Sequence, residues 1–177
     1  MNVAEVKKLL ESNKNERGMK HWEKWNMPWT SYGIGLTQLK KIAKQIGRDH
    51  ELALELWKQD NYDMITLATM VDEPKKITRE QVEEQAKRLQ FWMLAHSYSS
   101  NLMPNVSFQK ELAEEWITEK DDIRRRLAYL LVYNIARDDK KLDDAWFEPL
   151  IDQIKANLQS EENFVKDAMN NALIMIG

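Results

Sequence analysis

Glycine is almost confined to the start of this chain. The 177 residues contain five glycines, and no glycine lies between Gly47 and Gly177. Sheets and α/β folds of this size normally need glycine at turns, bulges and phosphate-binding loops. The distribution therefore favours an all-α fold over β-rich and α/β folds.

Composition fits one globular domain, and we expect residues 1–177 to form a single repeat domain. Hydrophobic residues make up 43% of the chain and charged residues 31%, which supplies a core and a solvated surface. Cysteine is absent. The absence excludes disulfides, iron–sulfur clusters, thiolate zinc sites and cysteine nucleophiles.

Charge is distributed unevenly along the chain. The net charge is −3, with +2 in residues 1–88 and −5 in residues 89–177. This balance is not the strongly basic one of a typical nucleic-acid-binding domain. The first residues lack an apolar core of signal-peptide length, and no long apolar run follows. We therefore expect a cytoplasmic protein that does not contact a membrane.

Apolar residues recur at helical spacing through nearly the whole sequence. The pattern predicts helices at about 2–12, 18–26, 37–46, 49–59, 62–72, 78–89, 91–103, 107–116, 121–137, 143–158 and 160–176. We expect Thr37, Asp49 and Ser107 to cap the N-termini of the helices at 37–46, 49–59 and 107–116. Gly47 is expected to end the first of these helices. Short connections make neighbouring helices antiparallel. A closed bundle and an open α-α superhelix of HEAT-like pairs both satisfy this, and we favour the superhelix.

The seven tryptophans divide into three groups. Trp57, Trp116 and Trp146 fit the apolar stripes of their helices and are expected in the core. Three others, Trp22, Trp25 and Trp29, are spaced three and four apart. Their spacing favours a hydrophobic stripe, with an aromatic surface for stacking bases as the alternative. Trp92 lies one turn before His96, so their rings share one helix face, either in the core or lining a pocket.

Other candidate motifs are weak. The Arg124–Arg126 run should place at least one arginine toward the inside, where a buried guanidinium needs an anion for compensation. His50-Glu51 begins like a zinc-protease helix, but Leu54 replaces the second histidine ligand. Gly33-Ile34-Gly35 lacks the third glycine of a dinucleotide loop. We therefore predict no metal site and no cofactor.

Several segments of the sequence resemble one known family, the HEAT-repeat DNA alkylation repair proteins, which are the bacterial alkylpurine DNA glycosylases. The resemblance covers about residues 18–177 and is most specific in its first block. It rests on the block Gly47–Trp57 (GRDHELALELW), Tyr32-Gly33, Leu39, Ala43, Leu67-Ala68, Asp72-Glu73-Pro74, and the C-terminal Asn163-Phe164-Val165-Lys166, Ala168, Asn170, Ala172-Leu173 and Ile176-Gly177.

The resemblance implies a superhelix whose concave face holds duplex DNA and which excises N3- and N7-alkylated purines without a metal or cofactor. In such a site a carboxylate stabilises the cationic sugar and activates water, two tryptophans contact the sugar and damaged nucleotide, and an arginine binds a phosphate. The family does not require the damaged base to be flipped into a pocket, in contrast to most base-excising enzymes.

Two of the implied functional positions are kept and two are changed. Trp92 aligns with the first family tryptophan and Arg126 with the phosphate-binding arginine. His96 stands where the catalytic aspartate is expected, and Asn171 stands where the second tryptophan is expected. The arginine that many relatives carry in the 62–72 helix is missing as well.

These changes affect the chemistry that the resemblance implies. Neutral His96 can take a proton from water, but it cannot supply negative charge to the developing sugar cation. The prediction is a diverged DNA alkylation repair protein that binds alkylated duplex DNA, with weak or lost glycosylase activity. The catalytic candidates are Trp92, His96 and Arg126, and the substrate-binding candidates are Trp92, Arg126 and Asn171. The alternative is a non-catalytic HEAT-repeat module that binds a protein or a nucleic acid.

Overall fold

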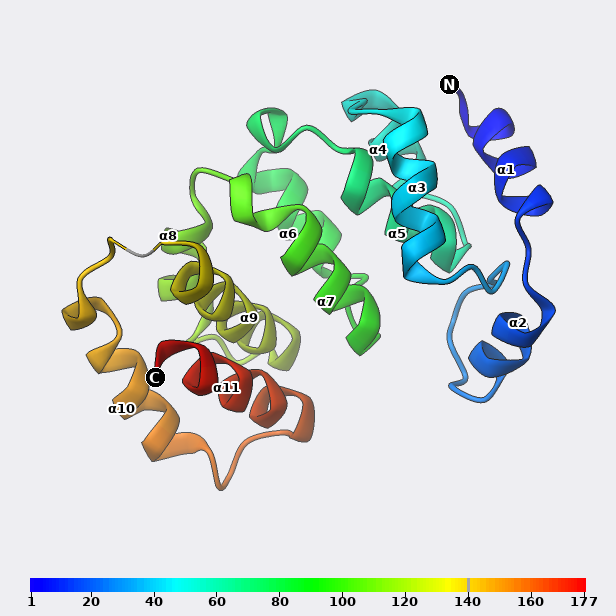
Figure 1. Cartoon of the computed structure of the whole chain (residues 1–177). Coiled ribbons are helices and arrows are strands. Elements are labelled where there is room, and N and C mark those ends of the chain that lie inside the picture. Colours follow the sequence, from blue (N-terminus) through cyan, green and yellow to red (C-terminus); the bar gives the residue numbers. More distant parts are fainter. Residues whose placement is uncertain (140) are drawn as a thin grey trace. The chain divides into compact units, whose positions relative to one another are not determined.

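The computed structural model describes residues 1–139 and 141–177, and their regular secondary structure is almost entirely α-helical (Figure 1). Apart from one isolated bridge between Thr30 and Asn61, the described residues form no β-structure. The chain divides into two compact units, Met1–Thr78 and Arg79–Gly177. The all-α prediction is confirmed. The single repeat domain expected over residues 1–177 stays a prediction.

The first unit is built around one buried helix. Its elements are α1 (Val3–Ser12), α2 (Glu16–Glu23), α3 (Leu36–Ile46), α4 (His50–Trp57), α5 (Tyr62–Val71) and the 3-10 turn η1 (Pro74–Lys76). Helix α5 packs against α1, α3 and α4, and nine of its ten residues are buried. An apolar helix surrounded in this way forms the core of the unit.

Asp63 on α5 binds the segment that connects α2 to α3 through hydrogen bonds. Its carboxylate is fully buried and accepts hydrogen bonds from the Ser31 hydroxyl (2.7 Å), the Tyr32 N–H (2.7 Å) and the Ile34 N–H (3.2 Å). Burial raises the pKa of Asp63, and these hydrogen bonds oppose the rise. Together with the backbone bonds between Thr30 and residues 60–62, the Asp63 side chain therefore holds the connecting segment to the core.

The second unit is organised around its longest helix. Its elements are α6 (Arg79–Ala86), α7 (Trp92–Asn101), η2 (Met103–Asn105), α8 (Gln109–Trp116), α9 (Asp122–Asp138), η3 (Asp144–Trp146), α10 (Glu148–Asn157) and α11 (Asn163–Ile176). Helix α9 packs against α7, α8 and α11. It therefore brings side chains of helices that are distant in sequence close to one another.

Two of the expected helix caps are wrong, whereas two other helix signals are confirmed. Asp49 caps α4 by accepting from the Leu52 N–H, and Gly47 ends α3 with a φ of 81°. Helix α3 begins earlier than expected, because the Gly35 carbonyl already accepts its first hydrogen bonds, so Thr37 lies inside the helix. Ser107 lies in a turn before α8, where the Gln109 N–H bonds back to Val106.

The prediction of core tryptophans holds for two of three side chains. Trp57 and Trp116 are buried. Trp146 is only half-buried, because it lies in the 3-10 turn before α10 rather than on a helix stripe. Its indole N–H donates to Glu114, and the Lys110 ammonium lies 5.1 Å from its ring. In the described part of the chain, no helix is long and apolar enough to cross a membrane.

Candidate functional site

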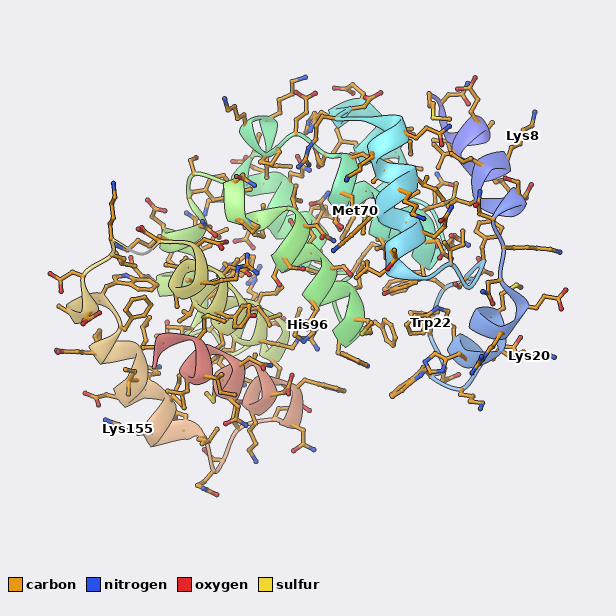
Figure 2. All side chains as sticks on the ribbon, viewed as in Figure 1. Lys8, Lys20, Trp22, Met70, His96 and Lys155 are labelled. Carbon is orange, nitrogen blue, oxygen red and sulfur yellow. The ribbon has the colours of Figure 1, made fainter. Side chains whose placement is uncertain are left out.

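Helix α7 places Trp92 and His96 side by side in the second unit. The two residues lie one turn apart, and their rings meet edge to face with centroids 6.1 Å apart and an interplanar angle of 89°. Both side chains are half-buried (Figure 2 labels His96). The predicted common face is thus confirmed, and it is partly open to solvent.

A carboxylate reaches His96 from another helix. Asp167 on α11 lies with its Oδ2 3.8 Å from the His96 Nε2, and 63% of its side chain is exposed. Asn171, one turn further along α11, donates a hydrogen bond of 3.2 Å to the same oxygen. The structure therefore links His96 to Asn171 through Asp167. Sequence reasoning missed Asp167, although its position one turn before Asn171 placed it on the same helix face.

The environment of His96 favours the neutral imidazole. Burial lowers the pKa of His96, the charge of Arg126 lowers it further, and Asp167 opposes both effects. Neutral imidazole has one ring nitrogen that can accept a proton. His96 is thus suited to receive a proton at physiological pH.

Arg126 on α9 is a buried cation without a carboxylate partner. Only 5% of the residue is exposed. Its guanidinium donates to the Leu89 carbonyl and lies 5.8 Å from the centroid of the Phe164 ring, and its Nε–H has no acceptor. None of the described carboxylates forms an ion pair with it; burial lowers its pKa, and the charges of Glu162 and Asp121 oppose this effect. A buried guanidinium in this state has unused donors for an anion.

The other two arginines of the run differ from Arg126. Arg124 pairs with Glu83, and Arg125 pairs with Glu161 at 2.6 Å and with Asp122. The expectation that at least one of the three points inward is therefore confirmed for Arg126. The run as a whole is no basic patch, because two of its charges are neutralised within the unit.

These contacts define one cluster, which we call the α7–α11 site: Trp92, His96, Arg126, Asp167 and Asn171. It offers a proton acceptor, a carboxylate, an aromatic face and a cation with unused donors. No group of three histidine, aspartate or glutamate side chains suitable for a metal ion occurs in the described chain. The α7–α11 site contains only one histidine and one carboxylate.

Comparison with known proteins identifies the family. The model of a family described as DNA alkylation repair enzyme matches residues 6–177. The chain belongs to the DNA alkylation repair enzyme family. The resemblance seen in its sequence is thereby confirmed over nearly the whole chain.

Relatives of this DNA alkylation repair family member include two uncharacterized Listeria proteins. Lin0241 of Listeria innocua is 28% identical over 149 residues, and Lmo0209 of Listeria monocytogenes is 28% identical over 156 residues. Each match covers 82% of this chain and 64% of the relative. The chain thus spans about two thirds of the length of these relatives.

A solved structure with the same fold supports the architecture. It is described as belonging to a new family of proteins related to the HEAT-like repeat DNA glycosylases with affinity for branched DNA structures. The match has a TM-score of 0.90 and 22% identity, and it covers 99% of this chain and 76% of the other. The expected HEAT-like helical fold is thereby confirmed. The roles of Trp92, His96, Arg126 and Asn171 stay predictions.

Proposed function

We propose that this member of the DNA alkylation repair enzyme family binds DNA and releases N3- or N7-alkylated purines at the α7–α11 site, at a low rate. The observation that carries the proposal is the buried guanidinium of Arg126, which forms no ion pair with a described carboxylate and feels Glu162 and Asp121 only through their charge. The activity needs no metal or cofactor, and we place it in the cytoplasm.

The proposed ligand of Arg126 is a DNA phosphate. Burying a cation without a counterion is costly, and a protein retains such a group where a ligand provides the compensating charge. Guanidinium binds phosphate oxygens through two parallel hydrogen bonds. The Phe164 ring next to the guanidinium is itself 47% exposed, so it can rotate aside when a phosphate enters.

His96 and Asp167 would together take the two roles of a single catalytic carboxylate, which are to accept a proton and to supply negative charge. His96 accepts a proton from water, and Asp167 supplies negative charge at a point 3.8 Å from the imidazole. Because 63% of the Asp167 side chain is exposed, water weakens its field, which explains a low rate. Asn171 positions the Asp167 carboxylate through its hydrogen bond.

The proposed reaction is hydrolysis of the N-glycosidic bond. The bond between C1′ and the purine nitrogen breaks, and the cationic purine leaves as a neutral base with both bonding electrons. A water oxygen forms the new bond to C1′, and the water proton passes to the neutral His96 ring. Trp92 borders His96 and contacts the sugar and the damaged nucleotide.

DNA as the ligand is supported by the family and by its structural neighbour. The family is described as DNA alkylation repair enzyme, and the structural neighbour is described as belonging to a family with affinity for branched DNA structures. Alkylated duplex DNA remains our specific proposal for this chain. An alkylated purine is a good leaving group, so a site with reduced charge can still release it.

The second candidate is a non-catalytic module that binds a protein or a nucleic acid. Residues 79–177 carry 13 basic and 18 acidic side chains, a net charge of −5. Four of the arginines, Arg79, Arg124, Arg125 and Arg137, form ion pairs within the unit. Paired charges release few counterions from DNA, which favours a weak or different ligand.

Base release separates the two candidates. The protein is incubated with duplex DNA that contains 7-methylguanine, and released base is measured for wild type, Arg126→Met, His96→Gln and Asp167→Asn. We expect slow release by wild type and a loss of about tenfold or more in each variant. Arg137→Gln, which breaks a surface ion pair, is the matched control and should release base normally.

The opposite results have defined meanings. Wild-type DNA binding without base release supports the non-catalytic module. Absence of both release and salt-sensitive DNA binding at low ionic strength excludes DNA as the ligand. His96→Asp restores a carboxylate on α7 and is expected to raise the rate above wild type if the α7–α11 site is catalytic.

A further inference from the structure

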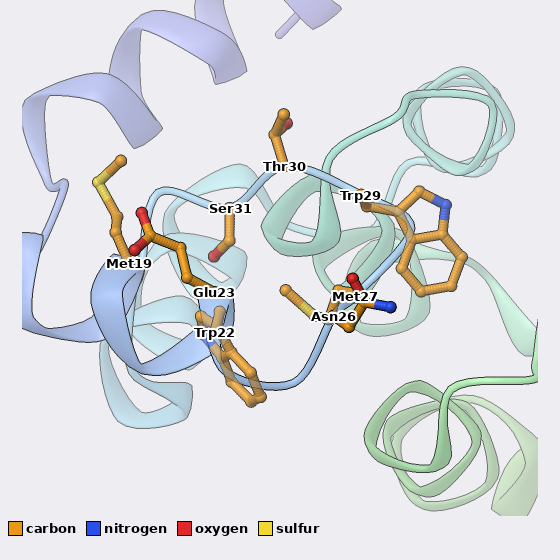
Figure 3. Close-up of a pocket in the computed structure, with 8 residues that line it drawn as sticks. All are labelled: Met19, Trp22, Glu23, Asn26, Met27, Trp29, Thr30 and Ser31. Carbon is orange, nitrogen blue, oxygen red and sulfur yellow. The ribbon is translucent and has the colours of Figure 1, made fainter.

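The first unit contains an aromatic pocket that the proposed function does not use. A pocket of about 340 Å³ lies between α2 and the segment that follows it, and we call it the α2 pocket. Its lining residues are Met19, Trp22, Glu23, Asn26, Met27, Trp29, Thr30 and Ser31 (Figure 3). This volume is at the small end of the range found for ligand-binding pockets.

The tryptophans around this pocket do not form the buried stripe favoured by their spacing. Trp22 and Trp29 are half-buried, and 49% of Trp25 is exposed. Trp22 is held in place by Tyr62, with ring centroids 5.0 Å apart. Two indoles that line an open pocket provide surfaces on which a flat ring system can stack.

The floor of the pocket is held rigidly. Ser31 and Tyr32 both donate to the buried Asp63 carboxylate, and the Thr30 hydroxyl donates to the Asp60 carbonyl. Asn26 has a φ of 48°, in the left-handed region that asparagine adopts more readily than most residues. The hydrogen bonds to Asp60 and Asp63 hold Thr30 and Ser31 in place at the pocket.

Two polar side chains of the pocket have groups available for a ligand. Glu23 is exposed and offers a carboxylate, which accepts hydrogen bonds. Asn26 is exposed and offers an amide, which both donates and accepts. A carboxylate accepts from the N–H bonds of an amino group, as in cytosine. An unpaired thymine offers only its N3–H, which lies between two carbonyl oxygens that repel a carboxylate, so an amino-bearing base is favoured.

Basic side chains on α2 favour a polyanion near the pocket. The first unit, Met1–Thr78, carries 13 basic and 11 acidic side chains, a net charge of +2, in a chain whose net charge is −3. Arg17, Lys20 and Lys24 line a second hollow on α2, together with Glu16 and His21. In the described chain, the ion pairs made by lysine or arginine begin only at Lys58. The basic groups of α2 are thus available for phosphates.

From the aromatic lining, the free carboxylate and the uncompensated basic face, we infer that the α2 pocket binds one unpaired, amino-bearing nucleobase of a single-stranded nucleic acid. The base stacks on Trp29 and Trp22, and Glu23 accepts from its amino group. Phosphates of neighbouring nucleotides pair with Lys20 and Lys24 on the other face of α2. Aromatic stacking and basic side chains along the backbone are the general means of single-strand recognition. The inference does not depend on base excision at the α7–α11 site.

Fluorescence anisotropy with labelled oligonucleotides tests the inference. Probes of about twelve nucleotides are oligo-dC, oligo-dT and a duplex of the same length, a size that suits one aromatic binding site. Wild type should bind oligo-dC more tightly than oligo-dT. Trp29→Ala should weaken oligo-dC binding by about tenfold or more. Trp146→Ala, which removes a half-buried tryptophan of the second unit, should bind like wild type.

Two further variants address the polar groups. Glu23→Gln should reduce the preference for oligo-dC over oligo-dT, since its amide oxygen is a weaker acceptor. The pair Lys20→Gln and Lys24→Gln should lower the salt-dependence slope by about 1.4, which corresponds to two lost phosphate contacts. Circular dichroism checks that each variant retains its helices.

Each proposal can fail without the other. Equal binding of oligo-dC by wild type and Trp29→Ala, or no single-strand binding by wild type, overturns the α2 pocket inference even if 7-methylguanine is released. Trp29-dependent binding of oligo-dC without any base release leaves this inference standing and overturns base excision alone.

Discussion

Asp167 lies 3.8 Å from His96, on a helix separated from α7 by more than sixty residues of chain. The pair couples a half-buried imidazole to an exposed carboxylate. Helix α9 packs against both α7 and α11, so it fixes the two helices that carry them. The packing of the second unit therefore supplies a carboxylate near position 96 although that position itself is a histidine.

The charges around His96 predict opposite pKa changes in two variants. Asp167→Asn should lower the pKa of His96, because the carboxylate now opposes the effect of burial. Arg126→Met should raise it, because a repelling cation is removed. NMR titration of the ring protons measures both, with His96→Gln used to assign the signal. Shifts in the same direction for both variants would contradict the arrangement.

The depressed pKa of His96 also predicts how stability depends on pH. The folded-state pKa lies below the ordinary value of 6.5, so the unfolded chain binds a proton more readily. The contribution of this group is fully present above pH 6.5 and is lost as pH falls through the folded-state pKa. Urea unfolding is measured at a series of pH values. Below pH 6.5, the free energy of unfolding should fall less for His96→Gln than for wild type. Identical profiles would show that His96 titrates equally in both states.

Arg126→Met separates a functional role of Arg126 from a structural one. Replacing buried ion pairs with apolar side chains is often neutral or stabilises a protein by about 1–4 kcal/mol, and a buried cation that forms no ion pair has still less to lose, although the bond to Leu89 is lost. We expect an unchanged or higher melting temperature together with about tenfold weaker DNA binding. A strong fall in melting temperature would assign Arg126 to stability instead. Arg124→Met, which removes a half-buried ion pair with Glu83, is the matched control.

The sequence was sufficient for the helices but not for all contacts of the site. Helical periodicity located α9 and α11 closely, and the spacing of Trp92 and His96 placed their rings together. Asp167 was missed because its partner is distant in sequence, and such a contact depends on how α7, α9 and α11 pack. The caps at Thr37 and Ser107 failed because backbone turns start α3 and α8 without their side chains.

The predicted burial is confirmed for Trp57 and Trp116, which are the last residues of α4 and α8. Trp25 follows the end of α2, and Trp146 lies in a 3-10 turn. Spacing alone does not distinguish a helix stripe from residues beyond the helix end, which is why the α2 pocket could not be located from the sequence.

Asp63→Asn should destabilise the first unit and open the α2 pocket. The wild-type carboxylate accepts three hydrogen bonds while fully buried, and the asparagine amide would direct two N–H groups at the same donors. A buried donor left unpaired costs about 1–3 kcal/mol, so we expect a loss of about 2–4 kcal/mol in the free energy of unfolding. Chemical denaturation followed by circular dichroism measures this loss. Glu55→Gln, which breaks an exposed pair with Lys58, should cost less than about 1 kcal/mol.

Asp63→Asn should also weaken oligo-dC binding under conditions where the variant remains folded, because Asp63 holds Ser31 and Tyr32 next to the pocket. Normal stability of Asp63→Asn would mean that the connecting segment is held by other contacts.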